Sequence, residues 1–110
     1  MIVYVSIGNS DDKLSQNQWH AYCAAVDRTF ELAARYTGSI VHGRWYSLPN
    51  EQWQNACWCV EFTEPDEMAQ IIGEYRAELG RLAGVFGQDS IAWAVAPVTE
   101  FLAPEVADVR

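Results

Sequence analysis

The sequence predicts a single two-layer α+β domain with the element order strand, helix, strand, strand, helix, strand. Four runs rich in β-branched and aromatic residues alternate with two stretches in which apolar residues recur every three or four positions. The chain has 110 residues, half of them hydrophobic, which matches the commonest size of one domain and suffices for one core.

This order is the ferredoxin-like βαββαβ pattern, a four-stranded antiparallel sheet in the order 4132 with two helices on one face. An α+β sheet of different strand order is the alternative that periodicity leaves open. We expect the domain to cover residues 1–103 and residues 104–110 to form a flexible C-terminal tail.

The first strand is expected at Ile2–Ile7, where a polar turn follows it. Ser15 and Gln18 have the spacing of a capping box, so the first helix is expected to begin at about Gln16. Gly38 can supply the left-handed residue that ends this helix.

Two strands, Ile40–Ser47 and Ala56–Phe62, are expected to form a hairpin with a long tip. Pro65 suits the first turn of the second helix, and Gly87 is expected to close it. The last strand is expected within Ser90–Val98.

Alternation within the strands predicts which side chains face the helices. The more apolar set is expected to meet them: Val3, Val5, Ile7, Val41, Trp45, Trp58, Val60, Phe62, Ile91, Trp93 and Val95. The remaining set is mixed and small: Tyr4, Ser6, His42, Arg44, Tyr46, Cys57, Cys59, Glu61, Ala92 and Ala94. A face of that composition either contacts solvent or pairs with a second copy, and we expect a two-fold homodimer.

Charge and cysteine content restrict the class of protein. The net charge of −8 disfavours DNA and RNA as partners, because nucleic-acid affinity depends on Lys and Arg that neutralise phosphates. No apolar run approaches the ~20 residues that span a bilayer, so no membrane partner is expected. The three cysteines and the lack of a signal-peptide pattern favour the reducing cytoplasm.

The predicted topology brings three connections to one end of the sheet. They contain the candidate ligand-binding residues Asn9, Ser10, Asp11, Asp12, Lys13, Trp53, Gln54, Asn55, Gln88, Asp89 and Ser90. Amides and hydroxyls fix a ligand by hydrogen bonds, and Trp53 offers a stacking surface. The competing explanation is that these residue types make turns and caps for local reasons. As loop residues, Asn9, Gln54, Asn55 and Gln88 are expected to contribute little to stability.

The sequence indicates a metal site or a catalytic site more weakly than it indicates a ligand-binding site. Asp11, Asp12 or Asp89 could serve a metal-dependent enzyme as base or ligand, although acids near a helix start usually complement its dipole. Cys57 and Cys59 share one strand face near His42, but the spacing is not a zinc signature and cysteines acting as small hydrophobes are the simpler explanation. No standard catalytic motif is present, so no metal or other cofactor is expected.

Three segments carry a resemblance: residues 6–14 (SIGNSDDKL), 53–59 (WQNACWC) and 88–94 (QDSIAWA). With them the chain resembles small uncharacterised proteins of actinobacteria and their phages over nearly its whole length. The resemblance implies no particular activity.

These observations together predict a non-catalytic binding domain for a small polar or nucleotide-like molecule, for example one that sequesters a signal molecule. A small metal-dependent enzyme that uses the aspartates is the first alternative. A protein-interaction or structural module is the second.

Overall fold

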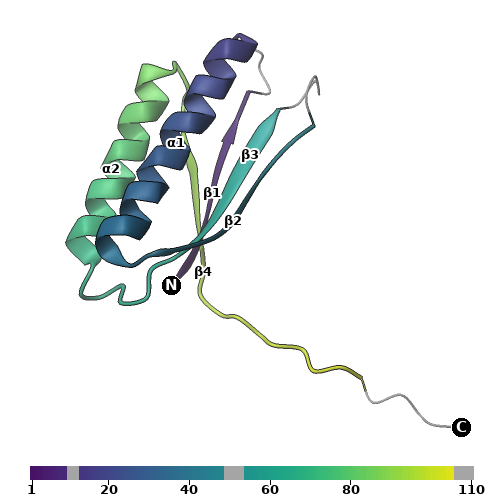
Figure 1. The fold of residues 1–110 in the computed structure, drawn as a ribbon, viewed down its shortest axis with the longest axis vertical. Coiled ribbons are helices and arrows are strands. Elements are labelled where there is room, and N and C mark those ends of the chain that lie inside the picture. Colours follow the sequence, from purple (N-terminus) through teal and green to yellow (C-terminus); the bar gives the residue numbers. More distant parts are fainter. Residues whose placement is uncertain (10–12, 49–53, 106–110) are drawn as a thin grey trace, which may run out of the picture.

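The computed structural model describes residues 1–9, 13–48 and 54–105. The elements follow the predicted order: β1 (Ile2–Gly8), α1 (Gln16–Thr37), β2 (Ile40–Tyr46), β3 (Asn55–Glu61), α2 (Ala69–Val85) and β4 (Ala92–Ala96). The four strands form one antiparallel sheet in the order β2-β3-β1-β4, and both helices cover the same face of it (Figure 1). The prediction of a ferredoxin-like α+β fold is confirmed.

Local chemistry sets both ends of α1. The Ser15 hydroxyl accepts a hydrogen bond from the backbone N–H of Gln18, and the Gln18 side chain accepts one from the N–H of Ser15. At the other end Gly38 has φ +72°, a conformation that costs a glycine little. The predicted capping box and C-terminal glycine are both confirmed.

The second helix begins later than predicted and ends where expected. Regular helix starts at Ala69, and turns occupy residues 65–68. Beyond the helix Gly87 has φ +65°, its N–H donates to the Gly84 carbonyl, and the Gln88 N–H donates to the Ala83 carbonyl. These two bonds form a Schellman motif, which satisfies carbonyls that the helix end leaves free.

One core lies between the sheet and the helices. Strands β1 and β3 pair in the centre of the sheet and bury every second side chain, which gives the fully buried Val3, Val5, Trp58 and Val60. Helix α1 adds Tyr22, Val26 and Phe30 to the same cluster. Burying such side chains is worth about 1.5–3 kcal/mol each, so the central strands and α1 are the main source of stability.

The predicted faces of β2 are wrong after its first residues. Val41 pairs with Val60 but Gly43 pairs with Cys59, so His42 is an extra residue in a β-bulge. A one-residue insertion exchanges the faces of all later side chains. Arg44 and Tyr46 therefore lie on the helix side and Trp45 on the uncovered side, the reverse of the expectation.

The chain continues beyond β4 without regular secondary structure. Residues 97–105 lead away from the domain as an extended segment, which we call the arm (Figure 1). Its start at residue 97 lies before the expected tail at 104–110, of which residues 106–110 lie outside the described part. Within the described residues, neither helix has the length and apolar character needed to cross a membrane.

Candidate functional site

The described residues that flank the three connections of the predicted site lie at one end of the sheet (Figure 1). Gly8 at the end of β1 pairs with Asn55 at the start of β3, and Ser6 pairs with Ala92 at the start of β4. Four of the candidate residues, Ser10, Asp11, Asp12 and Trp53, lie outside the described residues. The others can be placed individually.

Asn9 and Gln54 form a buried network between the β1–α1 connection and the start of β3. The Asn9 side-chain amide donates to the Leu14 carbonyl and to Gln54 Oε1, both at 3.1 Å, while Asn9 Oδ1 accepts from the Leu14 N–H at 3.0 Å. The Asn9 N–H also donates to the Gln54 carbonyl at 2.8 Å. Asn9 is 1% exposed and Gln54 5%. Both lie in loops as predicted, but they are buried rather than exposed, which removes the reason for expecting them to contribute little to stability.

The remaining described candidates are more peripheral. Asn55 is exposed, and its N–H and carbonyl bond the hydroxyl and N–H of Ser47, which holds β2 against β3. Gln88 donates to the Phe86 carbonyl at the end of α2, and Asp89 and Ser90 are exposed beyond it. Lys13 is exposed as well. Gln88 and its neighbours follow α2, and among the described residues no hydrogen bond joins them to Asn9 or Gln54.

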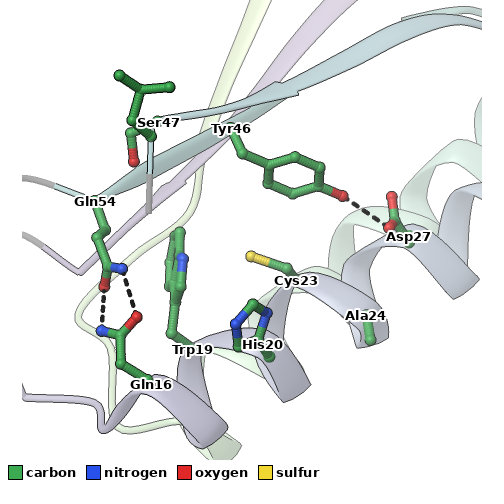
Figure 2. Close-up of a pocket in the computed structure, with 10 residues that line it drawn as sticks. Gln16, Trp19, His20, Cys23, Ala24, Asp27, Tyr46, Ser47 and Gln54 are labelled. Carbon is green, nitrogen blue, oxygen red and sulfur yellow. Dashed lines mark hydrogen bonds between the residues drawn. The ribbon is translucent and has the colours of Figure 1, made fainter. Parts of the chain in front are cut away.

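A cavity of about 590 Å³ opens beside this network, between α1 and the edge strand β2. Its α1 wall consists of side chains three or four positions apart: Gln16, Trp19, His20, Cys23, Ala24 and Asp27. The opposite wall consists of Tyr46, Ser47, Leu48 and Gln54. Figure 2 shows the Gln16–Gln54 pair at one end of this cavity and the Tyr46–Asp27 pair at the other, with Trp19, His20 and Cys23 between them.

The end near β1 is closed by two amides. Gln54 Nε2 donates to Gln16 Oε1 at 2.8 Å, and Gln16 Nε2 donates to Gln54 Oε1 at 3.0 Å (Figure 2). Gln54 thus belongs both to the buried network and to the cavity wall, so the network fixes the position of this end.

At the other end of the cavity, Asp27 accepts hydrogen bonds from three side chains. Its carboxylate accepts hydrogen bonds from the Trp58 indole N–H at 2.6 Å, the Tyr46 hydroxyl at 2.9 Å and the Arg44 guanidinium at 3.3 Å. Burial, followed by the hydrogen bond to Asp27, raises the pKa of Tyr46 to about 12, so its hydroxyl remains a donor at neutral pH. The Asp27 side chain is 18% exposed and that of Arg44 50%, so this end contacts solvent.

The cavity contains a cysteine and a histidine, the pair that many thiol enzymes use. Burial and the nearby Asp27 raise the pKa of the Cys23 thiol to about 12, whereas a nucleophilic cysteine needs a lowered pKa. The Asp27 carboxylate is occupied by its three donors. The geometry therefore suits binding better than nucleophilic chemistry.

The described residues also bear on the weaker metal hypotheses. His42 Nε2 lies 2.8 Å from Glu61 Oε1, and the Ser6 hydroxyl lies 3.3 Å from Cys57 Sγ. Across the described ranges no three His, Cys, Asp or Glu side chains are grouped so that they could hold a metal ion. Asp11 and Asp12 lie outside those ranges, so the hypothesis of a metal-dependent enzyme stays a prediction.

The cavity residues His20, Cys23, Asp27 and Tyr46 are not among the binding residues predicted from the sequence. Their α1 members repeat at the spacing of one helical face, which was a usable signal. Tyr46 was missed because the bulge in β2 was not anticipated.

The chain matches no protein-family model, no curated protein and no solved structure. The resemblance to actinobacterial and phage proteins stays a prediction. Any functional assignment therefore depends on the site itself.

Proposed function

We propose that this protein is a non-catalytic domain that binds a small molecule with a flat ring in the cavity between α1 and β2. The observation that carries the proposal is the cavity itself, whose volume falls within the ~300–1,000 Å³ typical of ligand sites. Stoichiometric binding without turnover is the property that sequestration of a signal molecule requires.

The cavity wall favours a ring with polar groups at its edges. Trp19 and Leu48 offer apolar surface, and Trp19 stands between the two polar ends (Figure 2). The Gln16–Gln54 amides can donate and accept, while Asp27 only accepts. A nucleobase or a similar heterocycle combines a flat ring with donors and acceptors along its edge.

The charges favour the ring of a nucleotide-like ligand over its phosphate. Besides the Cys23 thiol and the Tyr46 hydroxyl, which are neutral, the described part of the wall has two ionisable side chains, Asp27 and His20. This described part contains neither Lys nor Arg. The whole chain adds a net charge of −8. Arg44 partly offsets the Asp27 carboxylate, but the net charge of the chain repels anions, so a neutral or cationic ligand is the better fit.

A reducing compartment fits the described cysteines. Cys23, Cys57 and Cys59 are all free thiols. Thiols persist in the cytoplasm and tend to pair in oxidising compartments. We therefore propose that the protein acts in the cytoplasm.

A thermal-shift comparison of adenosine, adenosine monophosphate and tryptamine tests the proposal. Adenosine and tryptamine are expected to raise the melting temperature by about 5 °C at a concentration near ten times Kd, since such occupancy adds about 1.4 kcal/mol. The phosphate of the monophosphate is expected to reduce that shift. A larger shift with the monophosphate would contradict the charge argument.

Two alanines of α1 provide a matched pair of variants. Ala24 lines the cavity and Ala21 is exposed outside it. Ala24→Trp is expected to fill the cavity and abolish the shifts, whereas Ala21→Trp is expected to preserve them. Equal binding by both variants, or no shift with any of the three compounds, would overturn the proposal.

A further inference from the structure

The sheet face that the helices do not cover, here called the open face, is apolar and built mainly from small side chains. Strand pairing places on it Ile2, Tyr4, Ser6, Ile40, Trp45, Cys57, Cys59, Ala92, Ala94 and Ala96. Tyr4, Ile40 and Trp45 are exposed large hydrophobics on this face, and the Tyr4 and Trp45 rings meet edge to face at 6.4 Å. Isolated exposed hydrophobics are normal, but a continuous patch of this kind marks an interaction surface.

The open face also carries little charge. Its strands contribute one carboxylate, Glu61, which is paired with His42 at the margin. The whole chain has a net charge of −8, so two copies repel each other on average. The open face is a surface on which two copies can meet without bringing unpaired carboxylates together.

The arm carries a second set of exposed apolar side chains. Val98 is 73% exposed, Phe101 93% and Leu102 88%. The arm leaves the end of β4 and leads away from its own domain (Figure 1). Apolar side chains in such a position find a surface to pack against when a second molecule lies beside the domain.

A comparison of areas supports a dimer contact that uses both the open face and the arm. Three strands of seven residues and one of five, spaced ~4.8 Å apart with ~3.3 Å per residue, present a face on the order of 400 Å². A stable interface buries about 800 Å² on each partner. Phe101 alone can add ~200 Å², so the open face and the arm together approach the required area and the face alone does not.

We infer that the protein is a homodimer in which two open faces pack together and the arm of each copy lies against the other copy. The pocket between α1 and β2 lies on the helix side of the sheet, so this inference is independent of the proposed ligand. It corrects the predicted face at β2, because Trp45 lies on the open face whereas Arg44 and Tyr46 do not.

Light scattering coupled to gel filtration, with the full chain at ~50 µM, tests the inference. The wild type is expected to have about twice the chain mass of 12.4 kDa. Ala94→Arg, in the middle of the edge strand β4 on the open face, is expected to give a monomer with an unchanged circular dichroism spectrum. The matched control Ala77→Arg, on the exposed side of α2, is expected to stay dimeric.

Substitutions in the arm and the reactivity of two cysteines provide two further tests of dimerisation. Phe101→Asp with Leu102→Asp is expected to weaken dimerisation by about tenfold or more, since loss of one apolar anchor costs at least ~1.4 kcal/mol. Cys57 and Cys59 should react with a thiol reagent faster in the Ala94→Arg monomer than in the dimer.

A monomeric wild type, or a dimer that survives Ala94→Arg, would overturn the inference. A dimer that the arm variant leaves unchanged would overturn the role of the arm.

Discussion

The two polar ends of the cavity differ in how completely the fold encloses them. At one end Asn9 and Gln54 are almost fully buried and bond to each other and to the backbone. At the other end Asp27 has equally short bonds, yet one of its three partners, Arg44, is half exposed. The first end is held within the structure, and the second contacts solvent.

This difference bears on the binding residues predicted from polar composition, whose role stays a prediction. Amide side chains gathered at one end of a sheet predict binding only where they keep free donors and acceptors. Asn9 and Gln54 use most of theirs to join β1, α1 and β3, and one N–H of each amide in the Gln16–Gln54 pair remains outside that pairing. The cavity begins where that network ends.

The largest effect is expected from removing the centre of the buried end. Asn9→Ala deletes three side-chain hydrogen bonds and leaves the buried Leu14 carbonyl and N–H without those partners. Each unsatisfied buried group costs ~1–3 kcal/mol, so we expect a loss of about 2–4 kcal/mol in the free energy of unfolding, measured by urea denaturation. The exposed Asn17→Ala is the control and should change stability by less than ~0.5 kcal/mol. An Asn9 variant as stable as wild type would show that this end is not structural.

A smaller effect is expected at the Asp27 end. Tyr46→Phe removes one donor from a carboxylate that keeps two others and contacts solvent. We expect a loss of about 1 kcal/mol in the same urea experiment. A loss of unfolding free energy as large as that of Asn9→Ala would show that the Asp27 end stabilises the fold as much as the Asn9 end does.

Between the two ends, Cys23 makes stability depend on alkaline pH. Its pKa is about 12 in the folded protein, against an ordinary value of 9.0, so the unfolded chain loses this proton first. The stabilisation is complete below pH 9 and decreases as the pH rises toward 12, with a slope of up to ~1.4 kcal/mol per pH unit. Denaturation at pH 8 and at pH 10 should show that the wild type loses about 1 kcal/mol of unfolding free energy at the higher pH. The Cys23→Ala variant should lose less. Equal losses in both proteins would contradict the assignment to Cys23.

The smallest effect is expected beside the cavity, at Tyr22. Its ring stacks on Phe86 at 4.7 Å, and its hydroxyl is a buried group that finds no hydrogen-bond partner among the described residues. Because an unsatisfied buried hydroxyl is costly, Tyr22→Phe is expected to raise the free energy of unfolding by up to ~1 kcal/mol. A clear destabilisation would reveal a partner for that hydroxyl.

Features with local causes could be predicted from the sequence. The capping box at Ser15 and the left-handed glycines at 38 and 87 depend on neighbouring residues, and strand order followed from the order of elements. The bulge at His42 and the burial of Asn9 depend on pairing with distant residues, which periodicity does not reveal. Predicting the cavity required both kinds of feature, because its walls combine one face of α1 with Tyr46, which the bulge in β2 turns toward the helices.

The indole N–H signals in a proton–nitrogen NMR spectrum, recorded with and without adenosine, test the central claim most directly. Trp19 lines the cavity and Trp58 bonds Asp27 at its far end, while Trp45 lies on the open face and Trp93 packs under Arg76. The proposed site predicts that the Trp19 and Trp58 signals move on titration and that those of Trp45 and Trp93 stay in place. Movement of Trp45 or Trp93 alone, or of no indole signal, would contradict ligand binding between α1 and β2.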